Sequence, residues 1–264
     1  MITVLRIAIT VLVLTVVTLL LLPFQLMALR FDWPLRRRLP RWWHRTACRL
    51  LGIRIRIHGQ PERRRPLMLV ANHASWKDIL VLGAVADVAF IAKSDVATWP
   101  VFGLLAKWQK TVFVEREQKR KAGEQVNEIA ERLAKGEIIV LFPEGTTSDG
   151  NRLLTVKTSL FGAAASAVPA SPDGVVYVQP VSIAYTGIYG MPMGRYHRPI
   201  AAWPGDVELV PHLMGVLKAE ALDVDVDFGE AVEFRADTNR KIAGAAVIAR
   251  LRIQLQQRLY PRGG

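Results

Sequence analysis

The sequence predicts an α/β fold in which helices flank a mostly parallel or mixed sheet, preceded by a membrane-associating helical segment. Three observations support this prediction. After residue 66, apolar runs of strand length alternate with stretches of helical periodicity, as in a sheet covered by helices. Residues 7–29 carry no charge, and arginines crowd residues 30–65. We therefore expect a membrane-associating segment at 1–58 and one domain at 59–264.

The apolar run from Ile7 to Leu29 has 23 residues and lies between Arg6 and Arg30. A helix that rises about 1.5 Å per residue would be long enough here to cross the hydrocarbon core of a bilayer. A cleaved signal peptide fits less well, because arginines follow the run and no small-x-small cleavage site does. Pro23 permits a break, so a hairpin in one leaflet is the alternative to a full span.

The basic segment follows directly. Residues 30–65 hold 12 arginines against Asp32 and Glu62, which accounts for most of the formal net charge of +12. Within it, residues 34–51 combine an apolar stripe at helical spacing with tryptophans and arginines, as in a helix at the headgroup layer. The alternative is a soluble helix that packs its stripe on the core.

Arginines after an apolar run favour the cytoplasmic face of the inner membrane for the domain. We expect an anionic membrane as the partner of this segment, and no nucleic acid. The single cysteine, Cys48, agrees with a reducing compartment, and we interpret it as a helix-face residue.

The remaining elements follow in order. Strict alternation predicts a strand at 53–57. Further strand candidates are 67–71, 88–92, 111–115, 138–142, 175–183 and 223–228. Helix candidates are 78–86, 99–108, 119–135, 157–167 and 238–259. The clearest is 119–135, because its apolar residues recur on one face and Gly136 ends it.

The stretch 72–78, Asn-His-Ala-Ser-Trp-Lys-Asp, joins a predicted strand to a predicted helix. On a continuous helix, His73 and Asp78 would lie about 140° apart. They can meet only if His73 lies in the loop and Asp78 in the first helical turn, where the carboxylate could orient the imidazole as a general base. The alternative is a capping box of Ser75 and Asp78 behind an ordinary loop histidine.

Three more segments stand at predicted strand ends, where α/β proteins place their ligands. The strand 111–115 is followed by Arg116, whose guanidinium can hold an anionic group. Residues 142–148 read Phe-Pro-Glu-Gly-Thr-Thr-Ser; Glu144 could accept a hydrogen bond from a hydroxyl, although a plain turn is the alternative. Residues 178–183 contain Pro180, which is typical of an edge strand or a bulge.

The order and spacing of these four segments resemble the 1-acylglycerol-3-phosphate acyltransferase family, over about residues 60–185. The matching residues are Asn72, His73 and Asp78, Phe113 and Arg116, Phe142 to Thr146, and Val178 and Pro180. The resemblance implies an enzyme of lipid biosynthesis with a glycerolipid acyltransferase-like fold. It would transfer a fatty acyl group directly to the hydroxyl of a lysolipid, with His73 as base and Asp78 as its partner.

The resemblance also implies further roles. Five residues would bind the acceptor: Lys93, Arg116, Glu144, Gly145 and Thr146. Backbone N–H groups at the start of the helix 78–86 would stabilise the developing oxyanion. No cofactor is implied, because the acyl donor is itself a co-substrate thioester, with acyl carrier protein favoured over coenzyme A.

One departure concerns the acceptor. Family members that act on lysophosphatidate usually read Phe-Pro-Glu-Gly-Thr-Arg-Ser, whereas this chain has Thr147 in place of the arginine. Residues 190–195, 203–206 and 211–213 resemble a bacterial branch that includes enzymes acylating lyso-ornithine lipid. The resemblance therefore slightly favours lyso-ornithine lipid over lysophosphatidate as the acceptor.

Two other function classes fit parts of the sequence. A non-catalytic, membrane-anchored basic protein would explain residues 30–65 but not the strand-end motifs. A serine hydrolase using Ser75 or Ser159 would require a strained Gly-x-Ser-x-Gly turn, which the sequence lacks. The histidines outside the motif are too scattered to predict a metal site.

Overall fold

The structure is a computed structural model that describes residues 2–115, 119–156, 161–205, 207–218 and 221–260. Its strands are β1 (Ile53–His58), β2 (Leu67–Ala71), β3 (Val88–Lys93), β4 (Val112–Val114), β5 (Ile138–Leu141), β6 (Val176–Ile188), β7 (Met191–Pro192), β8 (Leu222–Phe228) and β9 (Val232–Phe234). Its helices are α1 (Ile2–Arg30), α2 (Leu35–Leu50), α3 (Lys77–Val85), α4 (Phe102–Trp108), α5 (Lys119–Ala134), α6 (Gly162–Ala167), α7 (Arg198–Ala201), α8 (Leu209–Lys218) and α9 (Arg240–Leu259), with short 3-10 turns η1 (Ser94–Thr98) and η3 (Val168–Ala170).

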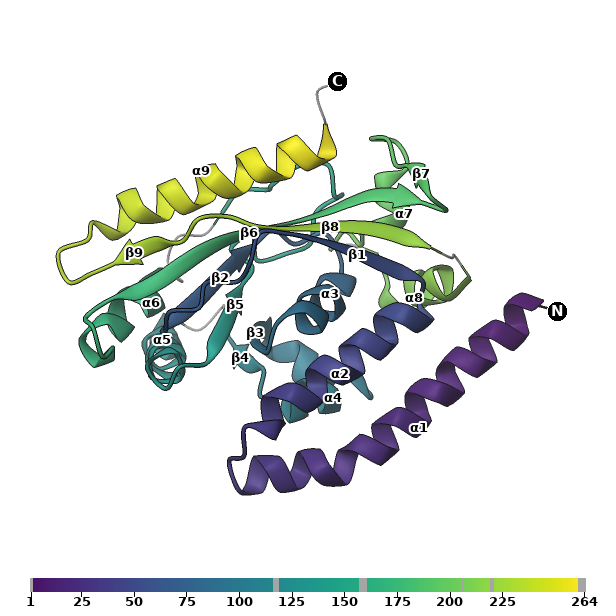
Figure 1. Ribbon diagram of the computed structural model, residues 1–264, viewed down its shortest axis with the longest axis horizontal. Helices are drawn as coiled ribbons and strands as arrows, with labels where there is room; N and C mark the ends of the chain where they lie inside the picture. The colour runs from purple at the N-terminus through teal and green to yellow at the C-terminus, as the bar shows by residue number, and fades with distance from the viewer. Residues whose placement is uncertain (1, 116–118, 157–160, 206, 219–220, 261–264) are drawn as a thin grey trace.

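A mixed sheet flanked by helices forms the centre of the molecule, as the sequence predicts (Figure 1). The strand order is β1-β8-β6-β2-β5-β3-β4, and β7 and β9 also pair with β6. Strands β6, β2, β5, β3 and β4 run parallel to one another, and β1 runs parallel to β8. The antiparallel pairing of β6 with β8 makes the sheet mixed. The ends of β2, β3 and β5 therefore lie at one edge of the sheet.

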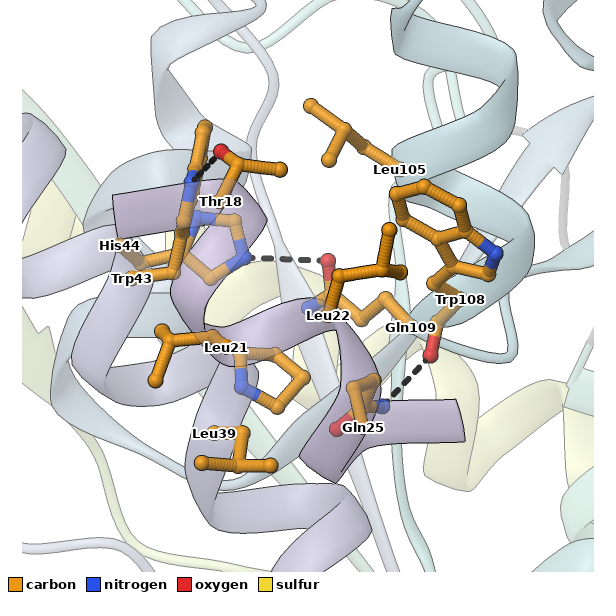
Figure 2. Close-up of a pocket in the computed structure, with 11 residues that line it drawn as sticks. Thr18, Leu21, Leu22, Gln25, Leu39, Trp43, His44, Leu105, Trp108 and Gln109 are labelled. Atoms are coloured by element: carbon orange, nitrogen blue, oxygen red, sulfur yellow. Dashed lines mark hydrogen bonds between the residues drawn. The ribbon is translucent and has the colours of Figure 1, made fainter. Parts of the chain in front are cut away.

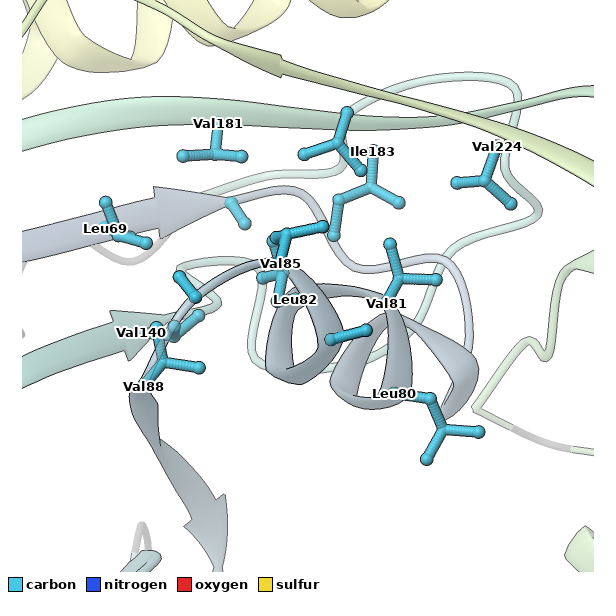
Figure 3. Close-up of a cluster of buried hydrophobic side chains, with 14 of the residues drawn as sticks. Leu69, Leu80, Val81, Leu82, Val85, Val88, Val140, Val181, Ile183 and Val224 are labelled. Atoms are coloured by element: carbon cyan, nitrogen blue, oxygen red, sulfur yellow. The ribbon is translucent and has the colours of Figure 1, made fainter. Parts of the chain in front are cut away.

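The sheet is buried on both faces, which explains why β2 is a continuous apolar run. Leu67, Leu69 and Ala71 belong to the core on one face, while Met68 and Val70 belong to the core on the other. On the first face, side chains of α3 such as Val81, Leu82 and Val85 pack against the sheet (Figure 3). On the second face, α5, α6 and α9 complete the core.

Helix α1 lies along the outside of α2 rather than projecting away from the domain (Figure 1). Near its N-terminus the Arg6 guanidinium donates to the carbonyl of Leu217 in α8. Near its C-terminal end the Gln25 amide donates to the carbonyl of Trp108 in α4, at 2.7 Å. Both ends of α1 therefore contact the domain, although the helix is long and apolar enough to cross a membrane.

A pocket of about 480 Å³, part of it open to solvent, lies between α1, α2 and α4 (Figure 2). Its lining is mostly apolar, and three hydrogen bonds link residues that line it. Trp43 Nε1 donates to Thr18 Oγ1 at 2.8 Å, and His44 pairs with Gln109 at 3.0 Å. The first bond joins α1 to α2, the second joins α2 to the residue after α4, and the bond from Gln25 to Trp108 joins α1 to α4. The predicted division at residue 58 stays a prediction.

Some elements differ from the sequence prediction. Helix α4 begins at Phe102 rather than at residue 99, because Trp99 precedes Pro100 and is held in an extended conformation with ψ 130°. Strand β6 continues to Ile188, five residues beyond the predicted end. Helices α7 and α8 arise where no element was predicted, since Pro199 and Pro211 obscure the helical pattern. Of the predicted helix 157–167, residues 157–160 lie outside the described residues.

Candidate active site

His73 lies in the loop after β2, and Asp78 is the second residue of α3. His73 Nδ1 is 2.9 Å from Asp78 Oδ2, with 17% of the histidine side chain exposed and none of the aspartate side chain. The prediction that the two residues meet across the loop-to-helix junction is therefore confirmed. The exposed part of the imidazole is what a base for an external hydroxyl requires.

The Asp78 carboxylate accepts four hydrogen bonds. Oδ2 accepts from His73 Nδ1 and from the N–H groups of Ala74 at 2.7 Å and Ser75 at 2.9 Å. Oδ1 accepts from the Tyr185 hydroxyl at 2.7 Å. Because the carboxylate offers Nδ1 only an acceptor, the imidazole hydrogen lies on Nδ1 and Nε2 keeps its lone pair.

The capping alternative is compatible with this geometry. The bond from the Ser75 N–H to Asp78 is the reciprocal half of a capping box. The other half is weak, because Ser75 Oγ lies 3.4 Å from the Lys77 nitrogen. Asp78 thus closes the first turn of α3 and holds His73 at the same time.

The backbone N–H groups at the start of α3, which were predicted to stabilise the oxyanion, already have acceptors within the protein. The N–H groups of Asp78 and Ile79 donate to the carbonyls of Ser75 and Trp76, at 3.0 and 3.3 Å. The N–H of Lys77 points to Ser75 Oγ. The prediction that the first amides of this helix face a substrate oxygen is therefore wrong for these three groups.

Residues on or next to the neighbouring strands hold His73 and its loop in place. The Phe142 ring stacks on the imidazole with centroids 4.0 Å apart, and Phe90 stacks on Phe142 in turn. The Asn72 side chain donates to the Ile183 carbonyl at 2.9 Å and accepts from the Ile183 N–H at 2.8 Å. The loop is thus tied to β6, and its position depends on the sheet rather than on its own sequence.

Glu144 supports the same loop. One carboxylate oxygen accepts from the His73 N–H and the other from the Leu154 N–H, both at 2.6 Å. The residue is only 4% exposed, and this burial raises the pKa of its carboxyl to about 7 in spite of the two N–H donors. The structure gives Glu144 a supporting position, and its predicted contact with the acceptor stays a prediction.

The other predicted acceptor-binding residues lie at the same edge of the sheet where the structure describes them. Gly145 has φ +73°, which favours glycine, and it precedes the exposed Thr146. Lys93 ends β3 and forms an ion pair with Asp95. Arg116 lies outside the described residues. Among the described residues, no group of three or more His, Cys, Asp or Glu side chains could hold a metal ion.

Two residues at the site escaped the sequence analysis. Lys77 is fully buried, and its ammonium donates to Ser75 Oγ at 3.0 Å and to the Ala201 carbonyl at 2.6 Å. Burial lowers the pKa of Lys77 to about 7, and the side chain joins the loop to α7. Tyr185, on β6, is the second. A sequence signal for Lys77 existed, because this charged residue directly precedes Asp78 in the motif. No residue near Tyr185 in the sequence indicates a contact with Asp78.

We expect Tyr185→Phe to lower kcat of the enzyme about tenfold and to destabilise the fold by about 1–3 kcal/mol, since one oxygen of a buried carboxylate loses its donor. Acyl-transfer kinetics and urea unfolding would measure the two effects. Tyr177→Phe is the matched control, because Tyr177 lies on the same strand with its ring in the core and under Arg64. Equal kinetics for the two variants would contradict a role for Tyr185 in holding Asp78.

Comparison with known proteins adds independent evidence. The family described as Acyltransferase matches residues 54–184. The chain is 65% identical over 257 residues to a lyso-ornithine lipid O-acyltransferase of Rhizobium meliloti, covering 97% of this chain and 88% of that protein. It is 51% identical to a lyso-ornithine lipid O-acyltransferase of Brucella abortus, covering 99% and 98% of the two chains.

More distant relatives carry the other acceptor in their names. A 1-acyl-sn-glycerol-3-phosphate acyltransferase of Neisseria gonorrhoeae is 33% identical over 168 residues, covering 64% of this chain and 61% of that protein. The crystal structure of the 1-acyl-sn-glycerophosphate (LPA) acyltransferase PlsC from Thermotoga maritima matches with a TM-score of 0.62 at 21% identity, covering 96% of this chain and 97% of that one. This structural match shows that the two chains share a fold.

Proposed function

Since this chain belongs to the acyltransferase family and is an O-acyltransferase of lysolipids, we propose that its acceptor is lyso-ornithine lipid and that His73 is its general base. The observation that carries the base assignment is the bond from His73 Nδ1 to the buried Asp78, which leaves Nε2 able to take a proton. The relatives of highest identity support the acceptor. The enzyme would thus complete a two-chain membrane lipid.

The proposed reaction is a direct transfer. His73 Nε2 takes the proton of the acceptor hydroxyl while that oxygen attacks the thioester carbonyl carbon, which forms the new C–O bond. The tetrahedral intermediate then collapses, the C–S bond breaks, and the imidazolium returns its proton to the thiolate. Asp78 stabilises the imidazolium that exists between the two steps.

The environment of Thr147 supports the acceptor. Thr147 is 7% exposed and carries no charge, at the position where the resemblance leads us to expect an arginine in enzymes that act on lysophosphatidate. A phosphate monoester carries net negative charge and is best held by charged donors, whereas the carboxylate and ammonium of the ornithine headgroup cancel in charge. Lysophosphatidate is the second candidate, because the Neisseria relative bears that activity in its name.

Charge and architecture support the remaining assignments. The resemblance favours acyl carrier protein over coenzyme A, and the arginines of residues 30–65 would attract either acidic donor. The protein is membrane-associated, and the arginines after α1 support the cytoplasmic face of the inner membrane. The contacts at both ends of α1 support insertion into one leaflet rather than a full span.

An assay of two donors against two acceptors tests these assignments. The full-length protein, reconstituted in vesicles, would receive a labelled acyl group on acyl carrier protein or on coenzyme A, with lyso-ornithine lipid or lysophosphatidate as acceptor. We expect the highest kcat/KM for acyl carrier protein with lyso-ornithine lipid. A preference for lysophosphatidate by wild-type enzyme would overturn the acceptor assignment.

The variant Thr147→Arg tests, in the same assay, whether residue 147 sets the acceptor. A guanidinium at this position adds a phosphate ligand, so we expect the ratio of lysophosphatidate to lyso-ornithine turnover to rise by about tenfold or more. Thr238→Arg, which adds the same charge before α9, is the matched control. An unchanged ratio in Thr147→Arg would mean that residue 147 does not set the acceptor.

A further inference from the structure

Helix α8 buries Val216 in the core but leaves other apolar side chains outside it. All of its residues between Leu209 and Leu217 are apolar, glycine or proline except His212, and Lys218 is its only charged residue. Val210 is 68% exposed and Met214 39%, while Val216 is the buried residue of the helix. A surface helix of a water-soluble domain normally turns its apolar stripe inward. We therefore expect another apolar surface to cover the outward-facing side chains of α8.

The exposed stripe continues the apolar surface of α1. The Arg6 guanidinium donates to the Leu217 carbonyl, which places the first turns of α1 against the C-terminal turn of α8 (Figure 1). The neighbouring side chains of α1 are also exposed, with Leu5 at 61%, Ile9 at 48% and Leu12 at 62%. The two helices thus present one apolar surface, larger than either would present alone.

The inner side of α8 contacts the loop that carries His73. Trp76 Nε1 donates to His212 Nδ1 at 3.0 Å, and His212 Nε2 donates to the Ala202 carbonyl at 2.8 Å. One accepting and one donating nitrogen describe a neutral imidazole, in agreement with burial that lowers the pKa of His212 to about 4. Through Trp76, α8 is therefore joined to the residues directly before Asp78.

We propose that α8 is a second membrane-contact helix, which lies beside α1 at the boundary of headgroups and acyl chains and holds the His73 loop at the bilayer surface. The occupant of this surface is lipid because it continues the surface of α1, the membrane-associating helix. Exposed Lys218 at the end of α8 also suits anionic headgroups. This inference rests on the proposed function. If the enzyme acylates a lysolipid, a helix α8 in contact with the bilayer would let that single-chain lipid reach His73 without leaving the membrane.

Site-specific labelling tests the proposal on the full-length protein. Val210→Cys would carry an environment-sensitive fluorophore, in vesicles of phosphatidylcholine and phosphatidylglycerol with brominated acyl chains. The native Cys48 does not compete for label, because burial raises the pKa of its thiol to about 12. Leu12→Cys on α1 is the positive control. Ile253→Cys is the negative control, since it is 54% exposed on α9, across the sheet from α1 (Figure 1).

We expect bromine to quench the probe at residue 210 as strongly as the probe at residue 12, and to leave the probe at residue 253 unquenched. Quenching at 12 without quenching at 210 would overturn the proposal. So would a signal at 210 that depends on protein concentration and not on vesicles, because a second copy would then cover α8. Absence of quenching at both residue 12 and residue 210 would overturn the proposal and membrane association together. Because quenching does not depend on acyl transfer, this result is separate from a failure of the proposed enzymatic function.

A second measurement does not depend on a label. Replacing Val210 and Met214 together by glutamate should weaken vesicle binding about tenfold, because the two side chains no longer gain from apolar burial. Ile253→Glu should bind as wild type does. Equal binding by the double variant and wild type would also overturn the proposal.

Discussion

Acyl transfer by His73→Ala is expected to fall by about 10³-fold to 10⁴-fold in kcat, with vesicle binding unchanged. The substitution removes the group that takes the proton from the acceptor hydroxyl. The fold should persist, because the imidazole is partly exposed and its ring contact is with Phe142, which remains packed on Phe90. Steady-state kinetics with labelled acyl thioester, beside vesicle flotation, would measure the two properties.

His197→Ala is the matched control for this variant. His197 is an exposed histidine outside the catalytic loop, so its loss should leave kcat at the wild-type value. The contrast separates the loss of a particular base from the loss of any histidine. Near wild-type transfer by His73→Ala would contradict the proposed mechanism, and it would leave the non-catalytic and serine-based alternatives to be reconsidered.

Asp78→Asn is the second substitution with a large expected effect, a loss of about 10⁴-fold in kcat. Asparagine has nearly the same shape, but its NH₂ group can face Nδ1 and drive the imidazole to the tautomer with hydrogen on Nε2. That tautomer has no lone pair for the acceptor hydroxyl. The amide also cannot accept all four hydrogen bonds that Asp78 accepts, so we expect a stability loss of about 1–3 kcal/mol.

Kinetics and urea unfolding would be measured together, so that inactivity is not mistaken for unfolding. Asp237→Asn, the same chemical change at an exposed position, should alter neither property. A folded Asp78→Asn enzyme with wild-type kcat would show that Asp78 only closes the turn of α3.

The junction that brings His73 and Asp78 together could be predicted because its geometry is local, whereas the choice of a catalytic pair over a helix cap came from the resemblance of the four segments. The five-residue separation of His73 and Asp78 excludes a shared helical face, and the apolar run before it is a strand with both faces buried. The loop-to-helix junction follows from these two facts. Glu144 was found for the same reason, since it follows a strand that is parallel to β2 and ends at the same edge.

The supports of the pair could not be predicted, because they come from distant parts of the chain. Tyr185 is 107 positions from Asp78, and Ile183 is 111 positions from Asn72. Their contacts arise from the pairing of β6 with β2, which no local pattern specifies. The support that Glu144 gives to the loop could not be predicted either, because one of its two N–H partners, His73, lies 71 positions away.

For the N-terminal segment, too, some features could be predicted from the sequence and others could not. Composition alone predicted the apolar helix and the arginine-rich helix after it, and both are present. Composition could not show that α1 folds back onto the domain, because that arrangement depends on single contacts of Arg6 and Gln25 with α8 and α4. Helix α8 was missed because Pro211 and the apolar residues on most of its sides obscure the helical pattern.

The central claim is that His73 transfers an acyl group directly to lyso-ornithine lipid. A rapidly quenched single turnover of wild-type and His73→Ala enzyme, with acyl carrier protein as donor, tests it most directly. We expect wild-type enzyme to form the ester product as fast as it releases the thiol, with the protein mass unchanged, and His73→Ala to form almost none. Product formation by His73→Ala at the wild-type rate, or an acyl group found on the wild-type protein, would contradict it.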